Sequence, residues 1–361
     1  MHETPKVLIL ATSPMTRGGI TSVIKAYQLC DVWKDFHCRW IETHRDGSAF
    51  VKLVYFIYAL FQYVLLLPYY DIVHIHVSEP PSALRKCFFM PLAKFLRKKT
   101  ILHFHSFSPD TTVKSNKAYL YSYLFGKADI VIALSPYWKR EIYSALPQIK
   151  CEKIHVLYNP CTCEMYPETY RKKNSILFAG AIVARKGYED LLRAYAQVVK
   201  MHPDWDLVIA GDGELNKAKA IVKELNIIDK VKFLGWIRGQ DKDRAFKEAS
   251  IFCLPSYAEG FPMAVLDAWA YGLPVVATPV GGLLDIAKEN TNIMLFPVGE
   301  VRTLCDKLCQ IIEKKEFRRK MGEEGLKLAD TTFNQYTIAN QLAQLYTLLA
   351  DPKKKDNSII S

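Results

Sequence analysis

Residues 254–282 read LPSYAEGFPMAVLDAWAYGLPVVATPVGG and are the most informative stretch of this sequence. Gly260 and Pro262 mark a tight entry from a loop into a helix, because glycine permits unusual backbone angles and proline suits a first helical turn. Apolar residues then recur at helical spacing as far as Gly272, and the apolar run 275–277 predicts a short buried strand. The stretch therefore predicts a loop, a helix and a strand of an α/β domain.

The same stretch holds two carboxylates, Glu259 just before the predicted helix and Asp267 inside it. If the helix runs unbroken, they lie roughly 12 Å apart along its axis. That exceeds the ~5–9.5 Å of an acid/base pair that flanks one glycosidic bond. We interpret them as residues that bind two separate parts of one elongated ligand, with backbone N–H groups between them that bind an anion. A nucleotide diphosphate sugar has this shape.

Length and composition indicate a globular chain of two domains, with 361 residues of which 50% are hydrophobic. The net charge of +11 is uneven, because residues 1–165 hold 20 Lys and Arg against 12 Asp and Glu. A basic half attracts nucleic acid, a phosphorylated ligand or an anionic membrane. Nucleic acid is the weakest of these partners, because the sequence has no basic stripe interleaved with aromatics and no zinc-finger spacing.

The cysteines and the N-terminus both indicate an intracellular protein. The nine cysteines are an odd number, and their spacing lacks the pairs and histidine partners of a zinc site. We interpret them as free thiols in a reducing cytoplasm. The apolar run Val7–Ala11 is too short for the hydrophobic region of a signal peptide.

One segment, Val51–Tyr70, has about the length of a membrane span, and Lys52 and Gln62 are its clear polar interruptions. We favour a buried or interfacial helix of an α/β domain over a span, because α/β units flank the segment on both sides. A third interpretation stays open, in which aromatic side chains on one helix face rest against lipid headgroups.

Strands and helices alternate in both halves of the chain, which predicts a doubly wound parallel sheet in each. The punctuated stretch Asn159–Asn174 between the halves is typical of a linker. Open α/β sheets bind ligands at the carboxyl ends of their strands, so the loops there are the ones to inspect. The predicted strands are 7–11, 71–77, 100–105, 130–134, 154–157, 175–179, 207–210, 231–234, 275–277 and 294–296.

Two of these loops favour a phosphate ligand. Arg185 and Lys186 stand beside a glycine at the start of a predicted helix, where charge and N–H donors together form a phosphate site. Gly18 and Gly19 follow the first strand and could let the backbone approach a ligand, although a glycine pair alone is more often a turn. The fingerprint G-x-G-x-x-G is absent there, which counts against an NAD enzyme.

Four histidines alternate on two strands, so that each pair points to one sheet face. They are His74, His76, His103 and His105. A metal cluster is one interpretation, but we favour structural histidines at the end of two strands, with no metal. His105 is the candidate that reaches a ligand, because it comes last in its strand.

Together these segments resemble the GT-B-fold glycosyltransferases, specifically the large retaining family 4. The resemblance is strongest in residues 254–282 and in LFAGAIVARKGYEDLL at 177–192, and it extends to LVIAGDGEL, VKFLGWI, VLYNPC, DIVHIH and ILHFHS. It implies two Rossmann-like doubly wound α/β domains that face each other across a cleft. Residues 1–165 would bind the acceptor and 170–333 the nucleotide-sugar donor, while a helix at about 335–350 would pack back on the first domain.

The resemblance also assigns roles to residues of this sequence. Glu259 should meet the donor sugar's hydroxyls, Lys186 and Arg185 the diphosphate, and Asp267 the ribose hydroxyls. The catalytic residues that it implies are Glu259, Lys186, Arg185 and His105. The other donor-binding residues that it implies are Gly260, Phe261, Pro262 and Met263 near the sugar and phosphates, Trp236 and Ile237 near the base, and Gly18 and Gly19, which with His105 would close over the donor.

Two positions depart from the family pattern. The family usually has Arg after the glycine at 180, where this chain has Ala181, so the diphosphate charge rests on Lys186 with Arg185 as a substitute. The second carboxylate is usually Glu, and Asp267 is one methylene shorter, which makes its ribose contact looser or water-mediated.

The implied reaction is a metal-independent transfer, with retention, from a nucleoside diphosphate sugar, UDP before GDP. The acceptor would be a saccharide or a lipid-linked saccharide of cell-surface polysaccharide (capsule, O-antigen or exopolysaccharide) biosynthesis. We expect no cofactor, no nucleic acid, and a cytoplasmic protein with peripheral contact to an anionic membrane. The alternatives are a GT-B-fold nucleotide-sugar epimerase, a phosphorylase, for which the sequence shows no pyridoxal-phosphate lysine context, and a non-catalytic sugar-nucleotide-binding protein.

Overall fold

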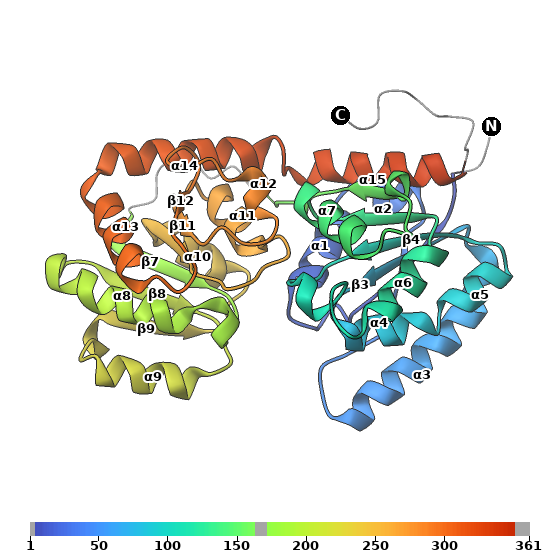
Figure 1. Ribbon diagram of the computed structural model, residues 1–361, viewed down its shortest axis with the longest axis horizontal. Coiled ribbons are helices and arrows are strands. Elements are labelled where there is room, and N and C mark those ends of the chain that lie inside the picture. Colours follow the sequence, from blue (N-terminus) through green and yellow to red (C-terminus); the bar gives the residue numbers. More distant parts are fainter. Residues whose placement is uncertain (1–3, 163–171, 351–361) are drawn as a thin grey trace. The chain divides into compact units, whose positions relative to one another are not determined.

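The computed structural model of the chain describes residues 4–162 and 172–350. They belong to two compact α/β units, Met1–Pro160 with Gln335–Ser361, and Cys161–Asn334. Figure 1 shows helices packed around a parallel sheet in each unit. The α/β class expected from the sequence is confirmed.

The first unit contains a six-stranded parallel sheet in the order β2-β1-β3-β4-β5-β6. Its central strands are fully buried apolar runs, as a parallel sheet covered on both faces requires. The strands are β1 Val7–Ala11, β2 Arg39–Glu42, β3 Ile72–Val77, β4 Lys99–Phe104, β5 Ile130–Ala133 and β6 Ile154–Val156. The α-helices before residue 160 are α1 Gly19–Gln28, α2 Asp31–Asp35, α3 Ala49–Leu66, α4 Pro80–Cys87, α5 Met90–Phe95, α6 Ala118–Lys127 and α7 Pro136–Ala145.

The last described helix, α15 (Gln335–Ala350), also belongs to the first unit and packs on α1 and α2. The rings of Phe36 and Tyr346 lie 5.1 Å apart, and the Cys30 Sγ donates to the carbonyl of Gln335 at 3.7 Å. The chain therefore returns to its first unit after completing the second.

The second unit contains a parallel sheet in the order β12-β11-β10-β7-β8-β9. The strands are β7 Ser175–Ala179, β8 Asp206–Ala210, β9 Val231–Gly235, β10 Ile251–Leu254, β11 Val275–Ala277 and β12 Met294–Leu295. The α-helices are α8 Tyr188–Met201, α9 Leu215–Glu224, α10 Gln240–Glu248, α11 Met263–Ala270, α12 Leu283–Ile286, α13 Val301–Glu313 and α14 Lys315–Asp330. Most of the strands match the ranges predicted from the sequence within a residue or two.

The sequence did not predict two strands, β2 and β10, or three α-helices, α2, α6 and α12. β2 is a partly exposed edge strand of four residues, and α6 is rich in aromatic residues without a clear helical period. The apolar run of β10 leads without a break into the stretch that begins at Leu254. Residues 163–171 of the predicted linker lie outside the described residues.

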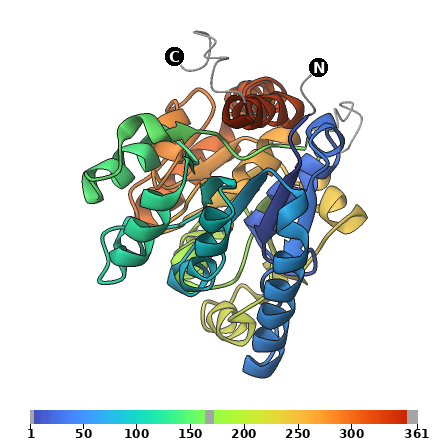
Figure 2. The same ribbon diagram turned by 90° about the vertical axis from the view of Figure 1, so that its right-hand side faces the viewer.

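The segment expected to form a buried or interfacial helix forms α3 and the short 3₁₀ turn Leu67–Tyr69. It is long and apolar enough to cross a membrane, with a mean hydropathy of 1.9, yet only 17% of it is buried. Of the two forms expected, the buried helix is wrong, because α3 lies at the outside of the unit (Figures 1 and 2) and leaves large apolar side chains exposed, while the interfacial helix stays a prediction.

The strand order of the second sheet places two loops side by side. The chain starts at β7, runs outward through β8 to β9, and then crosses to β10 on the other side of β7. Loops that leave the carboxyl ends of two such neighbouring strands diverge to opposite faces and open a ligand crevice between them. The crevice position of this sheet is therefore set by the loop after β7 and the loop after β10.

Candidate functional site

The loop after β7 carries the two predicted cations. Residues Ala184–Lys186 form a single 3₁₀ turn, and Gly187 with φ of 67° then starts α8. A Cβ at Gly187 would lie 1.9 Å from the carbonyl oxygen of Pro255, so only glycine allows this loop to touch the loop after β10. The two loops are also joined by a hydrogen bond from the Tyr257 N–H to the Arg185 carbonyl, at 2.8 Å.

The carboxylate of Glu259 lies at the centre of the site and is nearly buried, with 7% of its side chain exposed. Its Oε1 accepts from the Lys186 Nζ at 2.5 Å and from the Ser256 Oγ at 2.6 Å. The Arg185 Nη1 lies 3.8 Å from Oε2 and donates to the Ala258 carbonyl at 2.6 Å. The structure thus brings together the three charged residues that the sequence predicted for this end of the site.

Ser256 was not predicted as a site residue, although it lies only three residues before Glu259. It is buried, and its carbonyl accepts a hydrogen bond from the Thr278 Oγ1 at 2.5 Å after β11. Serine is so common in loops that its presence there carries no signal. In the structure it orients the buried carboxylate, because its hydroxyl donates to Oε1 while its backbone is held by the neighbouring strand.

Residues 260–263 lead directly from Glu259 into α11. A Cβ at Gly281, whose φ is 56°, would lie 1.8 Å from the Glu259 carbonyl oxygen, and the Gly282 N–H donates to the Gly260 carbonyl at 2.8 Å. Helix α11 begins at Met263 with Pro262 as its N-cap and no side-chain cap. The first N–H groups of a helix have no partner inside it and attract an anion.

Helix α11 is shorter than the unbroken helix from Glu259 to Asp267 that gave the separation of roughly 12 Å between their carboxylates. It does not include Glu259, so the rise of 1.5 Å per residue applies only from Met263 to Asp267, which gives roughly 6 Å. Asp267 lies on α11, and its Oδ2 pairs with the Lys242 Nζ of α10 at 2.8 Å. No pattern in the sequence points to Lys242, because only the tertiary fold brings α10 to α11.

Trp236 and Ile237, the residues expected near a base, follow β9 at the edge of the sheet. Three strand spacings separate β9 from β10, which amounts to roughly 14 Å at about 4.8 Å each. They therefore lie away from Glu259, on the side of the sheet where the far end of an elongated ligand would lie.

In the first unit, Gly18 and Gly19 lie at the start of α1, after the loop that follows β1, whereas His105 lies directly after β4. Gly18 is the N-cap of α1 with φ of 147°, and a Cβ there would meet open space. His105 follows β4, is partly buried, and its Nε2 lies 2.9 Å from the His76 Nδ1. Burial lowers the pKa of His105 to about 3, so the ring is neutral.

The four histidines form one stack on a single face of the first sheet. Neighbouring rings lie between 4.2 and 5.4 Å apart at angles of 10–33°, and the His74 Nδ1 lies 2.7 Å from the Tyr346 Oη. Contrary to the expectation of fully satisfied structural histidines, both nitrogens of His103 and the Nε2 atoms of His74 and His76 have no hydrogen-bond partner. One ring nitrogen from each of His74, His76 and His103 lies within 4.8 Å of the others, a spacing that could hold a metal ion.

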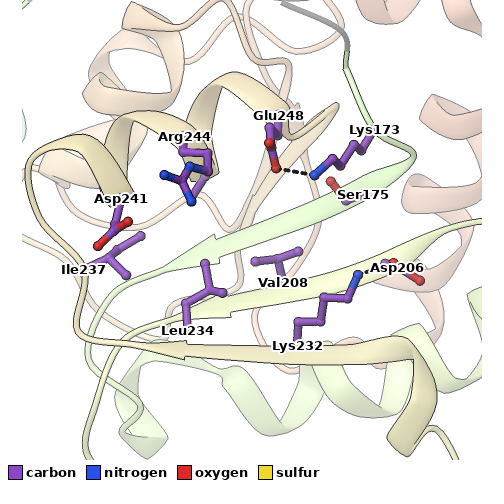
Figure 3. Close-up of a pocket in the computed structure, with 11 residues that line it drawn as sticks. Lys173, Ser175, Asp206, Val208, Lys232, Leu234, Ile237, Asp241, Arg244 and Glu248 are labelled. Carbon is purple, nitrogen blue, oxygen red and sulfur yellow. Dashed lines mark hydrogen bonds and ion pairs between the residues drawn. The ribbon is translucent and has the colours of Figure 1, made fainter.

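A pocket of about 350 Å³ lies between α10 and strands β7–β9 (Figure 3). Ile237 and Asp241 line one end, and Lys173 and Asp206 line the other, near the amino ends of the strands. Lys186 and Glu259 are not among its lining residues. Because open α/β sheets bind ligands at the carboxyl ends of their strands, we place the candidate site at Glu259 and not in this pocket.

Comparison with known families matches both units. The model described as "Glycosyl transferases group 1" matches residues 167–328, and the model described as "Glycosyltransferase Family 4" matches residues 35–164. The chain spans about half the length of two curated relatives to which it is 30% and 32% identical.

Two further relatives and one solved structure resemble most of the chain. An uncharacterized 41.2 kDa protein in the cps region of Klebsiella pneumoniae is 24% identical over 94% of this chain and 99% of its own. One subunit of the human phosphatidylinositol N-acetylglucosaminyltransferase is 28% identical over 94% of this chain and 69% of its own. The structure of HepE from Anabaena in complex with UDP and glucose superposes with a TM-score of 0.76 at 18% identity, over 95% of this chain and 99% of its own.

Proposed function

We propose a donor and a reaction for this chain, which belongs to the group 1 glycosyltransferases of family 4 and has the GT-B fold. It is a glycosyltransferase. We infer that it transfers a sugar from a nucleoside diphosphate sugar, with UDP as the first candidate and GDP as the second. The observation that supports this donor most is the contact of Lys186, Arg185 and Glu259 at the crevice position of the second sheet.

The two cations lie beside the buried carboxylate of Glu259. We therefore assign the diphosphate of the donor to the cations and its sugar to the carboxylate. Lys186 and Arg185 stabilise the negative charge that builds up on the departing diphosphate, as fixed charges in a partly buried site do. Glu259 accepts hydrogen bonds from sugar hydroxyls, and its contact with Lys186 holds the carboxylate in place for that role. Arg185 substitutes for the arginine that the family has at the position of Ala181. The hydrogen bond from Arg185 to the Ala258 carbonyl, which holds its guanidinium beside Glu259, supports this role.

The rest of the donor extends from this point along the second unit. The backbone of Gly260–Met263 contacts the sugar and the phosphates, Asp267 contacts the ribose, and Trp236 with Ile237 contacts the base. Gly18, Gly19 and His105 contact substrate from the first unit. We infer a front-side displacement with retention, in which Lys186 and Arg185 supply the positive charge for the leaving group and no metal ion or other cofactor is required.

We propose a saccharide or lipid-linked saccharide as acceptor, in cell-surface polysaccharide biosynthesis at the inner face of the cytoplasmic membrane. The cps-region relative and the lipid in the name of the human relative support this class. The exposed apolar helix α3 supports an acceptor that lies in a membrane.

Turnover of a panel of UDP- and GDP-sugars tests the proposed function. We expect release of the nucleoside diphosphate from one donor, and loss of this release in Glu259→Ala and Lys186→Ala. NMR of the product's anomeric configuration then tests retention. Conversion of the donor to an epimer without release, or wild-type turnover in both variants, would contradict the proposal.

A further inference from the structure

Helix α3 presents a continuous apolar face to solvent. Nine large side chains on it and on the turn that follows are exposed by 46–75%, and they recur at the helical spacing of three and four residues. They are Phe50, Leu53, Val54, Ile57, Tyr58, Phe61, Val64, Leu65 and Tyr69. A soluble helix normally turns such a stripe inward and its charges outward, whereas here Lys52 is the only charged residue of the helix.

The opposite face of α3 is firmly seated on the first unit. Tyr63 is buried and its Oη donates to the Phe89 carbonyl at 3.1 Å, between α4 and α5. The Phe56 ring lies 5.6 Å from that of Phe88 and 6.0 Å from that of Phe89. The Ser48 side chain caps the helix by accepting from the Val51 N–H at 3.3 Å. A helix held in this way lies on the protein surface, so a membrane would meet it from the side and not be crossed by it.

The exposed apolar surface continues onto the neighbouring helices. Leu84 of α4, Phe88 after it, Phe95 of α5 and Leu96 are also exposed. Since Phe88 contacts Phe56 of α3, Phe88 extends the exposed side of α3, and we call these exposed residues of α3 together with Phe88 the apolar face. Exposed apolar patches of this extent mark contacts with a partner or a membrane.

The charged residues in the segment that carries the apolar face are mostly positive, although Lys86 among them is buried and Lys94 pairs with Asp129. Residues 47–99 contain seven Lys and Arg but only two acidic residues, Asp71 and Glu79. Asp71 accepts from the Lys6 N–H, and Glu79 accepts from Ser106 and Thr111 within the unit. The exposed basic residues include Lys52, Arg97 and Lys99. Such a border repels a second copy of itself and attracts an anionic surface.

We propose that the apolar face docks on an anionic lipid bilayer, with α3 lying in the plane of the interface. This rests on the proposed function, because it places the first unit where a lipid-linked acceptor is found. The apolar side chains of α3 enter the boundary between headgroups and acyl chains, the aromatic ones lie at headgroup level, and the basic border contacts lipid phosphates.

Flotation of the purified chain with vesicles of phosphatidylcholine alone, or with 30% phosphatidylglycerol, tests the docking. We expect binding to the anionic vesicles, weakened by salt, and about a 100-fold loss of affinity in Ile57→Ser/Phe61→Ser, because two exposed anchors no longer enter the bilayer. The matched control Leu29→Ser removes an equally exposed apolar side chain outside the apolar face and should bind like the wild type. Lys52→Glu/Arg97→Glu should lose the preference for anionic vesicles.

Wild-type chain that does not float, or a double serine variant that binds equally well, would overturn the docking. So would a wild-type dimer that becomes monomeric in this variant without any vesicle binding, because the face would then join two copies. Release of nucleoside diphosphate, measured without vesicles, separates the two proposals. If that release depends on Glu259 while vesicle binding fails, only the docking is wrong.

Discussion

Replacement of Lys186 by methionine separates the structural role of this residue from its catalytic role. Lys186 is 14% exposed in its side chain and pairs with the nearly buried Glu259 at 2.5 Å. Methionine keeps most of the side-chain volume but leaves the carboxylate with Ser256 and the more distant Arg185. The variant therefore places a poorly compensated charge inside the second unit.

The loss of stability expected for Lys186→Met follows from the burial of the Lys186–Glu259 ion pair. Breaking a buried ion pair costs about 3–5 kcal/mol, and the low end applies because Ser256 and Arg185 still contact Glu259. For a unit the size of Cys161–Asn334, about 3 kcal/mol lowers the Tm by about 6–12 °C. The transition state also loses one cation beside the leaving diphosphate, which costs about 10²–10³ in kcat.

The double variant Lys186→Met/Glu259→Leu supplies the control. Replacing both members of a buried pair by apolar residues is often neutral for stability, so calorimetry should show that the Tm recovers. Donor turnover, measured as released nucleoside diphosphate, should remain lost. A single variant that unfolds at the wild-type temperature would refute the buried pair, and one with wild-type kcat would refute the catalytic role.

Three further outcomes are expected from other parts of the structure. Gly187→Ala should lose more than about 2 kcal/mol of stability in urea titration, because the φ of Gly187 is positive and an added Cβ would meet backbone atoms. The control Gly126→Ala in α6 should not be destabilised, because the nearest atom to its added Cβ lies at 3.9 Å. Asp267→Asn should raise the KM for the donor several-fold with little change in kcat or Tm, since its ion pair is partly exposed; an unchanged KM would remove it from the donor site. Burial lowers the pKa of His74 to about 3 from 6.5, so the unfolded state binds more protons below pH 6.5 and stability falls toward pH 3. His74 accounts for about 1.4 kcal/mol of this loss at pH 5.5, so urea titration should find the loss smaller by about that amount in His74→Asn but unchanged in the exposed-site control His37→Asn.

The sequence predicts the fold well where an apolar run can only be a buried strand. Buried strands of a parallel sheet are short apolar runs between turn residues, and β1, β7 and β11 were found in this way. The edge strand β2 escaped because one buried residue in four leaves no such run. The sequence left open whether α3 is buried or interfacial, because its apolar residues surround the helix and composition does not tell which side meets protein.

The candidate site was predictable only where single loops carry it. Arg185, Lys186 and Glu259 each follow a strand, and the strand order brings their loops together. Ser256 and Lys242 have no local signature, since they act through side chains that meet only in the folded unit. The separation of roughly 12 Å predicted for Glu259 and Asp267 is also wrong, because α11 starts only after the turn at Pro262.

The affinity of the chain for UDP relative to uridine, measured by calorimetry, tests the central claim most directly. If Lys186 and Arg185 hold the diphosphate, the wild type should bind UDP at least about tenfold more tightly than uridine, since one charge-assisted hydrogen bond contributes about 1.5–3 kcal/mol. Lys186→Met should lose most of this preference and bind uridine as before. An equal preference for UDP in the variant and the wild type would contradict the account, because the diphosphate would then be held elsewhere.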